Sequence, residues 1–406
     1  MPLELKEPVG EDVAQREGLW TLNFGPQHPA THTTLRLVLT LDGETVVEAV
    51  PDIGFLHSGF EKLGEVLDFN QYVTIVDRMN YISPLANEIS WHHACEKLLD
   101  IELTPRTKYL RTMLAELMRI HDHLLCVGAC ILDLGGISAF MYLFNEREHI
   151  YDLCEEASGQ RFHTSFTRVG GLLYDVTDQW LAKVRAFIDA FPKALADVNR
   201  LVLKNRIFIE RTQGVGLLSR EEAINTGATG PIARASGVER DLRRDEPYLA
   251  YDELDFDVIC ASAGDCFARF HVRMLEMVES VKIIRQTLDK LPGGPIFPEE
   301  LGKEALPQKR EVYTSIEGLI HHFETIMPNR QPQPPKESVY GATESPNGEL
   351  GFYIVSDGTF RAYRARTRPP SLIHFAIFPR LIRGCMLSDV VAVLGSLNII
   401  AAELDR

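Results

Sequence analysis

Two histidines stand four residues apart near the start of the chain, in a segment that also holds glycine and proline. Residues 21–36 read TLNFGPQHPATHTTLR and include His28 and His32. An imidazole can donate a hydrogen bond, release a proton and regain it near neutral pH. We therefore expect this loop to present His32 to a small oxidised substrate, and His28 to hold the loop.

A single carboxylate interrupts a long apolar run further along. Residues 124–144 read LLCVGACILDLGGISAFMYLF and could cross a bilayer by length alone. Asp133 and the two glycines that follow favour a buried helix ending near Leu134 instead. A buried carboxylate needs a partner. That partner is either an N–H group of a nearby turn or a histidine, whose tautomer and pKa the carboxylate would set.

The sequence lacks the motifs that are typical of other classes of enzyme site. The chain has no GxGxxG, Walker, HExxH, GxSxG or CxxC motif, so no nucleotide, flavin or metal site of its own is predicted. Its seven scattered cysteines indicate reduced, mostly buried thiols. Closely spaced histidines cannot place both rings on one helical face, so we expect surface or cap positions for His92, His93, His121, His123, His321 and His322.

Composition narrows the class of protein. The 406 residues are 45% hydrophobic with a formal charge of −15, which indicates a large core and no nucleic-acid partner. The first residues, MPLELKEPVGED, lack the basic and apolar regions of a signal peptide.

The elements that must position these residues follow from periodicity. A β-hairpin is predicted over residues 34–50, with its turn at Asp42-Gly43. Apolar spacing predicts helices over 82–99, 106–134, 146–159, 179–203 and 265–288, a short helix over 389–397, and strands within 337–366. We divide the chain into 1–66 (β region with the histidine loop), 67–290 (helical bundle), 291–336 (proline-rich connection with one helix, 315–326) and 337–406 (β region and terminal helix). The fold class is α+β, mostly α.

Many ordered motifs along the chain resemble the quinone-site subunit of respiratory complex I, the NADH-quinone oxidoreductase. They are GPQHPATH (25–32), GFLHSGFEKL (54–63), DRMNYI (77–82), LDLGG (132–136), GQRFHTSFTRVGG (159–171), RASGVERDLR (234–243), GDCFARFHVRMLEM (264–277), ESVKIIRQ (279–286) and ELGFYIVSDG (349–358). The family is similar to the nickel-iron hydrogenase large subunit, which implies a helical core with β structure at both ends. The hydrogenase cysteine pairs are missing, so a cysteine-ligated nickel site is excluded on ligand count.

The resemblance implies roles for five residues. His32 and Tyr81 would donate hydrogen bonds to a quinone head group and supply its protons, and Asp133 would pair with the histidine. Arg78 and His163 would face a [4Fe–4S] cluster held by a separate iron–sulfur subunit, where a positive charge or a titrating imidazole would raise its reduction potential. The chain itself would bind no cofactor or metal.

Four positions depart from the family's common pattern. Thr33 stands where glycine is usual after the histidine, and Ser58 replaces a frequent arginine. Asn80 and Asn398 stand where aspartate is common, which removes negative charge near the site.

The resemblance thus implies a quinone-binding subunit of a proton-translocating NADH:quinone oxidoreductase, inactive alone. It would lie peripherally on the cytoplasmic side of a bacterial membrane, or on the matrix side in an organelle. Its partners would be the iron–sulfur subunit, other hydrophilic-arm subunits and a membrane-arm subunit at the quinone entrance. The alternatives are a scaffold subunit of a ferredoxin- or other donor-linked membrane oxidoreductase, without quinone chemistry of its own, and a hydrogenase-type membrane complex.

Overall fold

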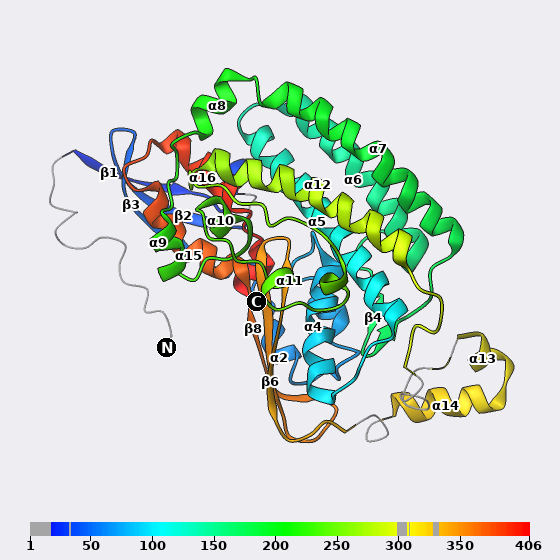
Figure 1. Ribbon diagram of the computed structural model, residues 1–406. Helices are drawn as coiled ribbons and strands as arrows, with labels where there is room; N and C mark the ends of the chain where they lie inside the picture. Colours follow the sequence, from blue (N-terminus) through cyan, green and yellow to red (C-terminus); the bar gives the residue numbers. More distant parts are fainter. Residues whose placement is uncertain (1–17, 32–33, 299–306, 308, 328–332) are drawn as a thin grey trace.

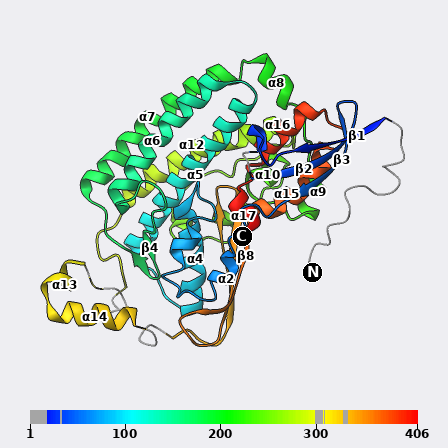
Figure 2. The ribbon, with the colours of Figure 1, turned by 180° about the vertical axis from the view of Figure 1, so that it is seen from behind.

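The computed structural model describes residues 18–31, 34–298, 307, 309–327 and 333–406. A bundle of long helices forms the body, with one small antiparallel sheet from each end of the chain beside it (Figure 1). The class is α+β and mostly α, as predicted. The C-terminus lies between the N-terminal sheet and the helices in both views (Figure 2).

The N-terminal sheet has the order β1-β2-β3, with all pairs antiparallel. Its strands are β1 (Leu19–Phe24), β2 (Arg36–Asp42) and β3 (Thr45–Asp52). The predicted hairpin is confirmed, and Gly43 in its turn has φ +58°, a conformation that glycine adopts without strain. The segment between β1 and β2 contains the 3₁₀ turn η1 (Pro29–Thr31), and two short helices, α2 (Phe60–Leu63) and α3 (Val73–Val76), follow β3.

The helical body is centred on α5, which packs against α4, α6, α12 and α16. Its long helices are α4 (Pro84–Leu99), α5 (Pro105–Asp133), α6 (Ile137–Ser158), α7 (Asp178–Val202) and α12 (Cys266–Lys290). Helix α5 begins after Thr104, whose side chain accepts a hydrogen bond from the N–H of Thr107. Of its 29 residues, 22 are buried, so α5 is enclosed on every side.

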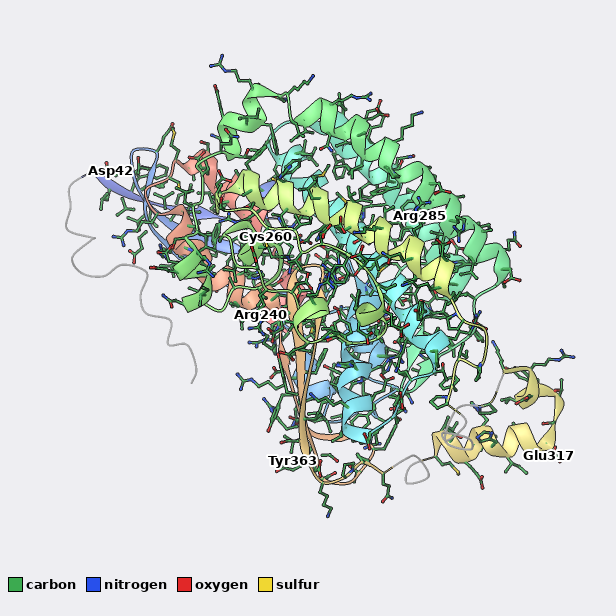
Figure 3. The ribbon with its side chains drawn as sticks, in the orientation of Figure 1. Asp42, Arg240, Cys260, Arg285, Glu317 and Tyr363 are labelled. Carbon is green, nitrogen blue, oxygen red and sulfur yellow. The ribbon has the colours of Figure 1, made fainter. Side chains whose placement is uncertain are left out.

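Shorter elements lie between α6 and α12 in the sequence. They are β4 (Thr167–Arg168), β5 (Gly171–Leu172), α8 (Arg206–Thr212), α9 (Arg220–Asn225), α10 (Gly230–Ala235), α11 (Leu242–Asp245) and η2 (Tyr251–Glu253). Helices α13 (Lys309–Thr314) and α14 (Ile316–Ile326) stand apart from the body in Figure 1, and Figure 3 labels Glu317 on α14.

The C-terminal sheet has the order β6-β7-β8 and packs against α4. Its strands are β6 (Ser338–Ser345), β7 (Gly348–Ser356) and β8 (Ala362–Arg368). Three helices follow it: α15 (Pro370–Ile382), α16 (Leu387–Leu397) and α17 (Ala401–Asp405). Helix α15 packs against β3, so the last part of the chain covers the N-terminal sheet.

The periodicity missed some helices. Helix α6 begins at Ile137 and not at residue 146. The prediction missed its first turns because they expose Ile137, Met141 and Tyr142 and so show no clear apolar face. The sequence predictions also contain no helix for α13, α15 and α17, or for the short helices α2, α3, α8, α9, α10 and α11. Helix α15 begins at a proline and contains Pro379, residues that are typical of loops and helix ends.

A group of seven buried charged residues lies among α5, α10, α11, α12 and β6. We call it the ionic cluster, and it consists of Glu116, Arg119, Arg234, Asp241, Arg243, Glu276 and Glu344.

Candidate functional site

A cavity of about 110 Å³ lies where the N-terminal sheet, α5 and the end of the chain meet. Four segments line it: the loop between β1 and β2, the residues just before α4, the C-terminal half of α5, and the stretch from α16 to α17. These segments are far apart in the sequence, so only the fold creates this space.

Tyr81 and Asp133, two of the three residues to which the resemblance gives proton chemistry, both line this cavity. The third, His32, lies outside the described residues, as does its neighbour Thr33. The residues on either side of that pair, Thr31 and Thr34, line the cavity as well. The described residues on both sides of His32 and Thr33 therefore lie at the cavity wall.

The loop before this segment is fixed by short-range contacts. Gly25 has φ +91°, and a Cβ there would lie 2.2 Å from the carbonyl oxygen of Leu35, so no other residue fits. The Thr31 hydroxyl donates to the His28 carbonyl at 3.0 Å. The Nδ1 atom of His28 accepts a hydrogen bond from the Ala30 N–H at 3.2 Å, and the His28 ring packs 4.2 Å from that of Phe24. These contacts agree with a loop-holding role for His28.

Asp133 is the last residue of α5 and is half-buried at the cavity. The helix ends there because Gly135 has φ +91°, and a Cβ at Gly136 would lie 2.4 Å from the side chain of Ile131. A Cβ at Gly395 would lie 3.8 Å from the carboxylate of Asp133, which shows that α16 passes close by.

Tyr81 lies just before α4 and is half-buried. Burial raises its pKa, and the negative charge of Asp122 on α5 raises it further. At neutral pH the Tyr81 hydroxyl therefore carries its proton and can donate it.

Arg78 and His163 form a second, neighbouring group and do not line the cavity. Arg78 is exposed, and its guanidinium donates to the Thr74 carbonyl. Burial lowers the pKa of the half-buried His163, and the nearby charge of Arg78 lowers it further. Asp77 ties the two segments together, because its carboxylate accepts hydrogen bonds from the backbone and hydroxyl of Ser165, both at 2.8 Å.

The expectation that the paired histidines are surface or cap residues is wrong for three of them. His92, His121 and His123 are buried, with hydrogen bonds to the Thr167 hydroxyl (2.7 Å), the Ile82 carbonyl (2.7 Å) and Glu276 (2.9 Å). The spacing argument assumed that a helix has one buried face. Helices α4 and α5 are enclosed all round, so both of their faces can bury a ring.

Sequence reasoning also missed Asp122 and Glu403, two fully buried carboxyls near the cavity. Burial raises the pKa of Asp122 to about 6, and burial with the charge of Asp122 raises that of Glu403 to about 8. The sequence signal for Asp122 is the segment RIHDHLL, in which several polar residues stand close together within the otherwise apolar helix α5.

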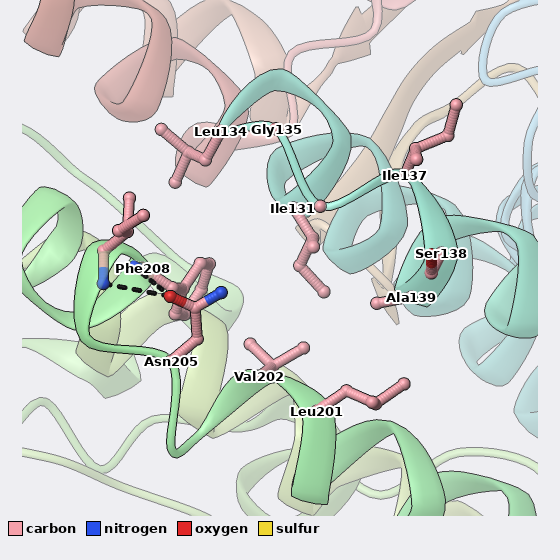
Figure 4. Close-up of a pocket in the computed structure, with 12 residues that line it drawn as sticks. Ile131, Leu134, Gly135, Ile137, Ser138, Ala139, Leu201, Val202, Asn205 and Phe208 are labelled. Atoms are coloured by element: carbon pink, nitrogen blue, oxygen red, sulfur yellow. Dashed lines mark hydrogen bonds between the residues drawn. The ribbon is translucent and has the colours of Figure 1, made fainter.

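A second pocket, of about 270 Å³, adjoins the end of α5 (Figure 4). Its walls come from residues 131–139 and from the turn between α7 and α8. In that turn the Asn205 side chain accepts hydrogen bonds from the N–H groups of Ile207 (3.0 Å) and Phe208 (3.4 Å). Three large apolar side chains that line it are exposed, those of Ile137, Leu201 and Ile207, and Met141 and Tyr142 are exposed further along α6.

Comparison with known proteins agrees with the motifs. The family described as the 49 kDa subunit of respiratory-chain NADH dehydrogenase matches residues 133–406, more than half of the chain. An NADH-quinone oxidoreductase subunit from Rhizobium etli is 47% identical over 404 residues, which are 99% of each chain.

The chain belongs to this family. NADH-quinone oxidoreductase subunits of other bacteria are also similar to this chain over nearly the whole length. That of Methylacidiphilum infernorum is 46% identical over 95% of this chain and 91% of its own, and that of Geotalea uraniireducens is 44% identical over 96% and 99%. The family membership makes the chain a subunit of complex I type.

None of the helices in the described ranges combines the length and apolar composition that a bilayer span requires. Residues 124–144 are instead divided between the end of α5 and the start of α6. The described residues also contain no group of three or more His, Cys, Asp or Glu side chains arranged to hold a metal ion.

Proposed function

We propose that this chain forms the quinone-reduction site of an NADH:quinone oxidoreductase, together with an iron–sulfur subunit. The observation that carries the proposal is that Tyr81 and Asp133 line one cavity with both flanks of the His32 segment. Tyr81 and Asp133 lie 52 positions apart in the sequence, and the quinone site that the resemblance implies requires them to lie close together.

Reduction of a quinone to a quinol takes up two electrons and two protons. The Tyr81 hydroxyl would donate a hydrogen bond to one quinone oxygen and then its proton, and His32 would do so at the other. Asp133 would stabilise the imidazolium form of His32 before the transfer. The half-buried carboxylate at the cavity wall supports this assignment.

The electrons would come from a [4Fe–4S] cluster on the partner subunit. Arg78 and His163 would face that cluster, and the exposed guanidinium of Arg78 supports a role at an interface. A positive charge beside a cluster stabilises its reduced form and so raises its potential. Because Arg78 is three residues from Tyr81, such a cluster would lie near the quinone cavity.

A membrane-arm subunit would dock on the apolar surface around the second pocket. This surface begins directly after Asp133, which lines the cavity, so a partner docked there would lie close to the proposed quinone site. Exposed apolar side chains in one area are typical of interaction sites. Docking there would make the chain peripheral to the membrane, on its cytoplasmic or matrix side, with quinone reduction coupled to proton translocation by the membrane arm.

The test is the turnover of the assembled complex carrying Tyr81→Phe or His32→Ala. Each change removes one proton donor, and we expect quinone reduction by NADH to fall about a hundredfold. Assembly and cluster content should remain normal. Tyr363→Phe is the matched control, because Tyr363 is exposed on the C-terminal sheet, away from the cavity (Figure 3). Wild-type turnover in both site variants would refute the proposal.

A scaffold subunit without quinone chemistry is the alternative function. It would place no constraint on where Tyr81 and Asp133 lie, whereas their common cavity supports the quinone site. For a scaffold, both site variants would behave like Tyr363→Phe.

A further inference from the structure

The side-chain amide of Asn398 is held at the cavity wall by two hydrogen bonds. Its Nδ2 atom donates to the Oδ1 atom of Asp122 at 2.6 Å and to the Oδ1 atom of Asn347 at 2.5 Å. An amide nitrogen carries two hydrogens, so both are used. Asn398 itself has φ +53° at the end of α16, a conformation that asparagine tolerates better than most residues.

Asp122 decides which way this amide turns. An ionised carboxylate only accepts hydrogen bonds, so Asn398 must direct its nitrogen, and not its oxygen, toward Asp122. Burial raises the pKa of Asp122 to about 6, although Asn398, Arg273, Arg147 and Asn80 act to lower it. At pH 7 and above Asp122 is therefore mainly ionised.

The groups that face Asp122 come from several elements. Arg147 lies on α6, Arg273 on α12, Cys126 on α5 and Glu403 on α17, and Tyr81 precedes α4. With a pKa raised to about 8, Glu403 is protonated at pH 7 and adds little charge. The Oδ2 atom of Asp122 has no hydrogen-bond partner within the described residues, and Asn398 provides the hydrogen bond to the Oδ1 atom.

Because the Nδ2 atom is directed at Asp122 and Asn347, the Oδ1 atom of Asn398 is the atom of this amide that can still accept a hydrogen bond. Asn398 lines that cavity, and no described residue donates a hydrogen bond to this oxygen. Tyr81, on the same wall, offers a hydroxyl that can donate. The cavity therefore presents a fixed acceptor as well as a donor.

A fixed acceptor distinguishes the two redox forms of a quinone. The oxidised form has only carbonyl acceptors, whereas the reduced form has two hydroxyl donors. A site that provides an acceptor binds the hydroxyl and leaves its own oxygen unpaired when the oxidised form is present.

We propose that Asn398 is a specificity-determining residue that binds a hydroxyl of the hydroquinone product, and that Asp122 is the positioning residue that fixes its amide. The proposal rests on the quinone function proposed above and adds the recognition of the reduced form. It also gives a role to Asn398, which stands where aspartate is common in the family.

The experiment measures two constants on the assembled complex with a water-soluble quinone: KM for the quinone, and Ki for the corresponding quinol as product inhibitor. In Asp122→Asn, the new amide can donate to Asn398, so the Asn398 amide is free to turn over. We expect Ki at pH 7.5 to rise about tenfold while KM changes less than about twofold. The exchange Asp122→Asn with Asn398→Asp restores an acceptor at the cavity wall, and Ki should return to near the wild-type value.

A pH series on the wild-type complex provides a test that needs no variant. As the pH falls through about 6, Asp122 gains a proton and can donate to Asn398, so the fixed orientation is lost. The ratio of Ki to KM should therefore rise below pH 6 in the wild type. It should not change over this range in Asp122→Asn.

A wild-type ratio that stays flat from pH 5 to 8 would overturn the proposal, and so would an unchanged Ki in Asp122→Asn. If Asp122→Asn does not assemble, the wild-type pH series decides. The two proposals fail separately. Wild-type turnover in both Tyr81→Phe and His32→Ala would overturn the quinone site itself. Impaired turnover in these variants, together with a flat ratio in the wild type, would overturn only the role of Asn398 and Asp122.

Discussion

The ionic cluster and the cavity wall both take charged side chains from α5. Glu116 and Arg119 belong to the cluster, and Asp122 lies only three residues beyond Arg119. All three side chains are buried. Their surroundings differ in one respect, the number of partners that each charge has.

Charges in the ionic cluster have several partners each. Arg234 lies 2.7 Å from Glu344, 2.9 Å from Glu276 and 3.4 Å from Asp241. Burial alone would raise the pKa of Glu116, but Arg119 and Arg243 outweigh it and lower this pKa to about 2. The Ser280 hydroxyl (2.6 Å) and the Tyr251 hydroxyl (2.7 Å) complete its hydrogen bonds.

At the cavity wall burial outweighs the effect of the partners, so the pKa values of the carboxyls are raised. Asp122 accepts its hydrogen bond from the neutral amide of Asn398, and burial raises its pKa to about 6. Glu403 accepts one from the Ser371 hydroxyl at 2.5 Å, and its pKa rises to about 8. Nearby cations thus lower the pKa of three cluster carboxyls, those of Glu116, Asp241 and Glu276. Burial outweighs the partners at the cavity wall, and also at Glu344 in the cluster, whose pKa is raised despite Arg234. We interpret the cluster as structural and the wall as functional on this ground.

The largest effect should come from breaking the cluster. Arg234→Met leaves three buried carboxylates without their shared cation, and we expect the free energy of unfolding to fall by about 3–5 kcal/mol. Urea-induced unfolding would measure it. Arg200→Met is the control, because Arg200 and Asp197 form an exposed pair on α7, worth less than about 1 kcal/mol. Equal losses in the two variants would contradict the structural role of the cluster.

Glu116→Gln should lose its effect in acid. The pKa of Glu116 is lower in the folded chain than its ordinary 4.5, so its ionised form stabilises the fold above pH 4.5. A lowering to about 2 corresponds to about 3 kcal/mol. The difference in stability between wild type and variant should shrink as the pH falls from 4.5 toward 2. A difference that stays constant over this range would show that charge is not its cause.

Asp122→Asn should have the opposite sign. The pKa of Asp122 is higher in the folded chain than its ordinary 3.8, so wild-type stability falls as the pH rises from 3.8 to about 6. The neutral variant avoids this loss and should be more stable above pH 6, by about 2–3 kcal/mol. Unfolding curves at pH 4 and pH 7.5 test it. A variant less stable than wild type at pH 7.5 would place Asp122 with the cluster.

The smallest effect concerns Cys126, which lines the cavity one turn after Asp122. Burial raises the pKa of its thiol to about 11. The negative charge of Asp122 also raises this pKa, whereas the positive charge of Arg273 lowers it. Asp122→Asn should therefore speed alkylation of Cys126 at pH 8 by about twofold, as measured by mass spectrometry. Cys154, buried on α6, is the control and should not change. Faster labelling of both thiols would indicate a general loosening of the fold.

Local patterns were sufficient for much of the fold. The hairpin at Asp42-Gly43 and the helices α4, α5, α7 and α12 carry clear turn or apolar periodicities, and the structure confirms them. Helix α15 and the first turns of α6 were missed. The prolines of α15 and the exposed apolar side chains of α6 obscure the apolar periodicity from which helices are predicted.

The sequence by itself determined the family, through ordered motifs, and pointed to Tyr81, Asp133 and the His32 segment. Only the tertiary structure decided which carboxylates remain titratable. Asp122 and Asn398 are 276 residues apart, and nothing in either segment signals that one will orient the other. The physical reason is that the pKa and orientation of a buried polar group depend on the partners that packing provides, and residues distant in sequence provide them here.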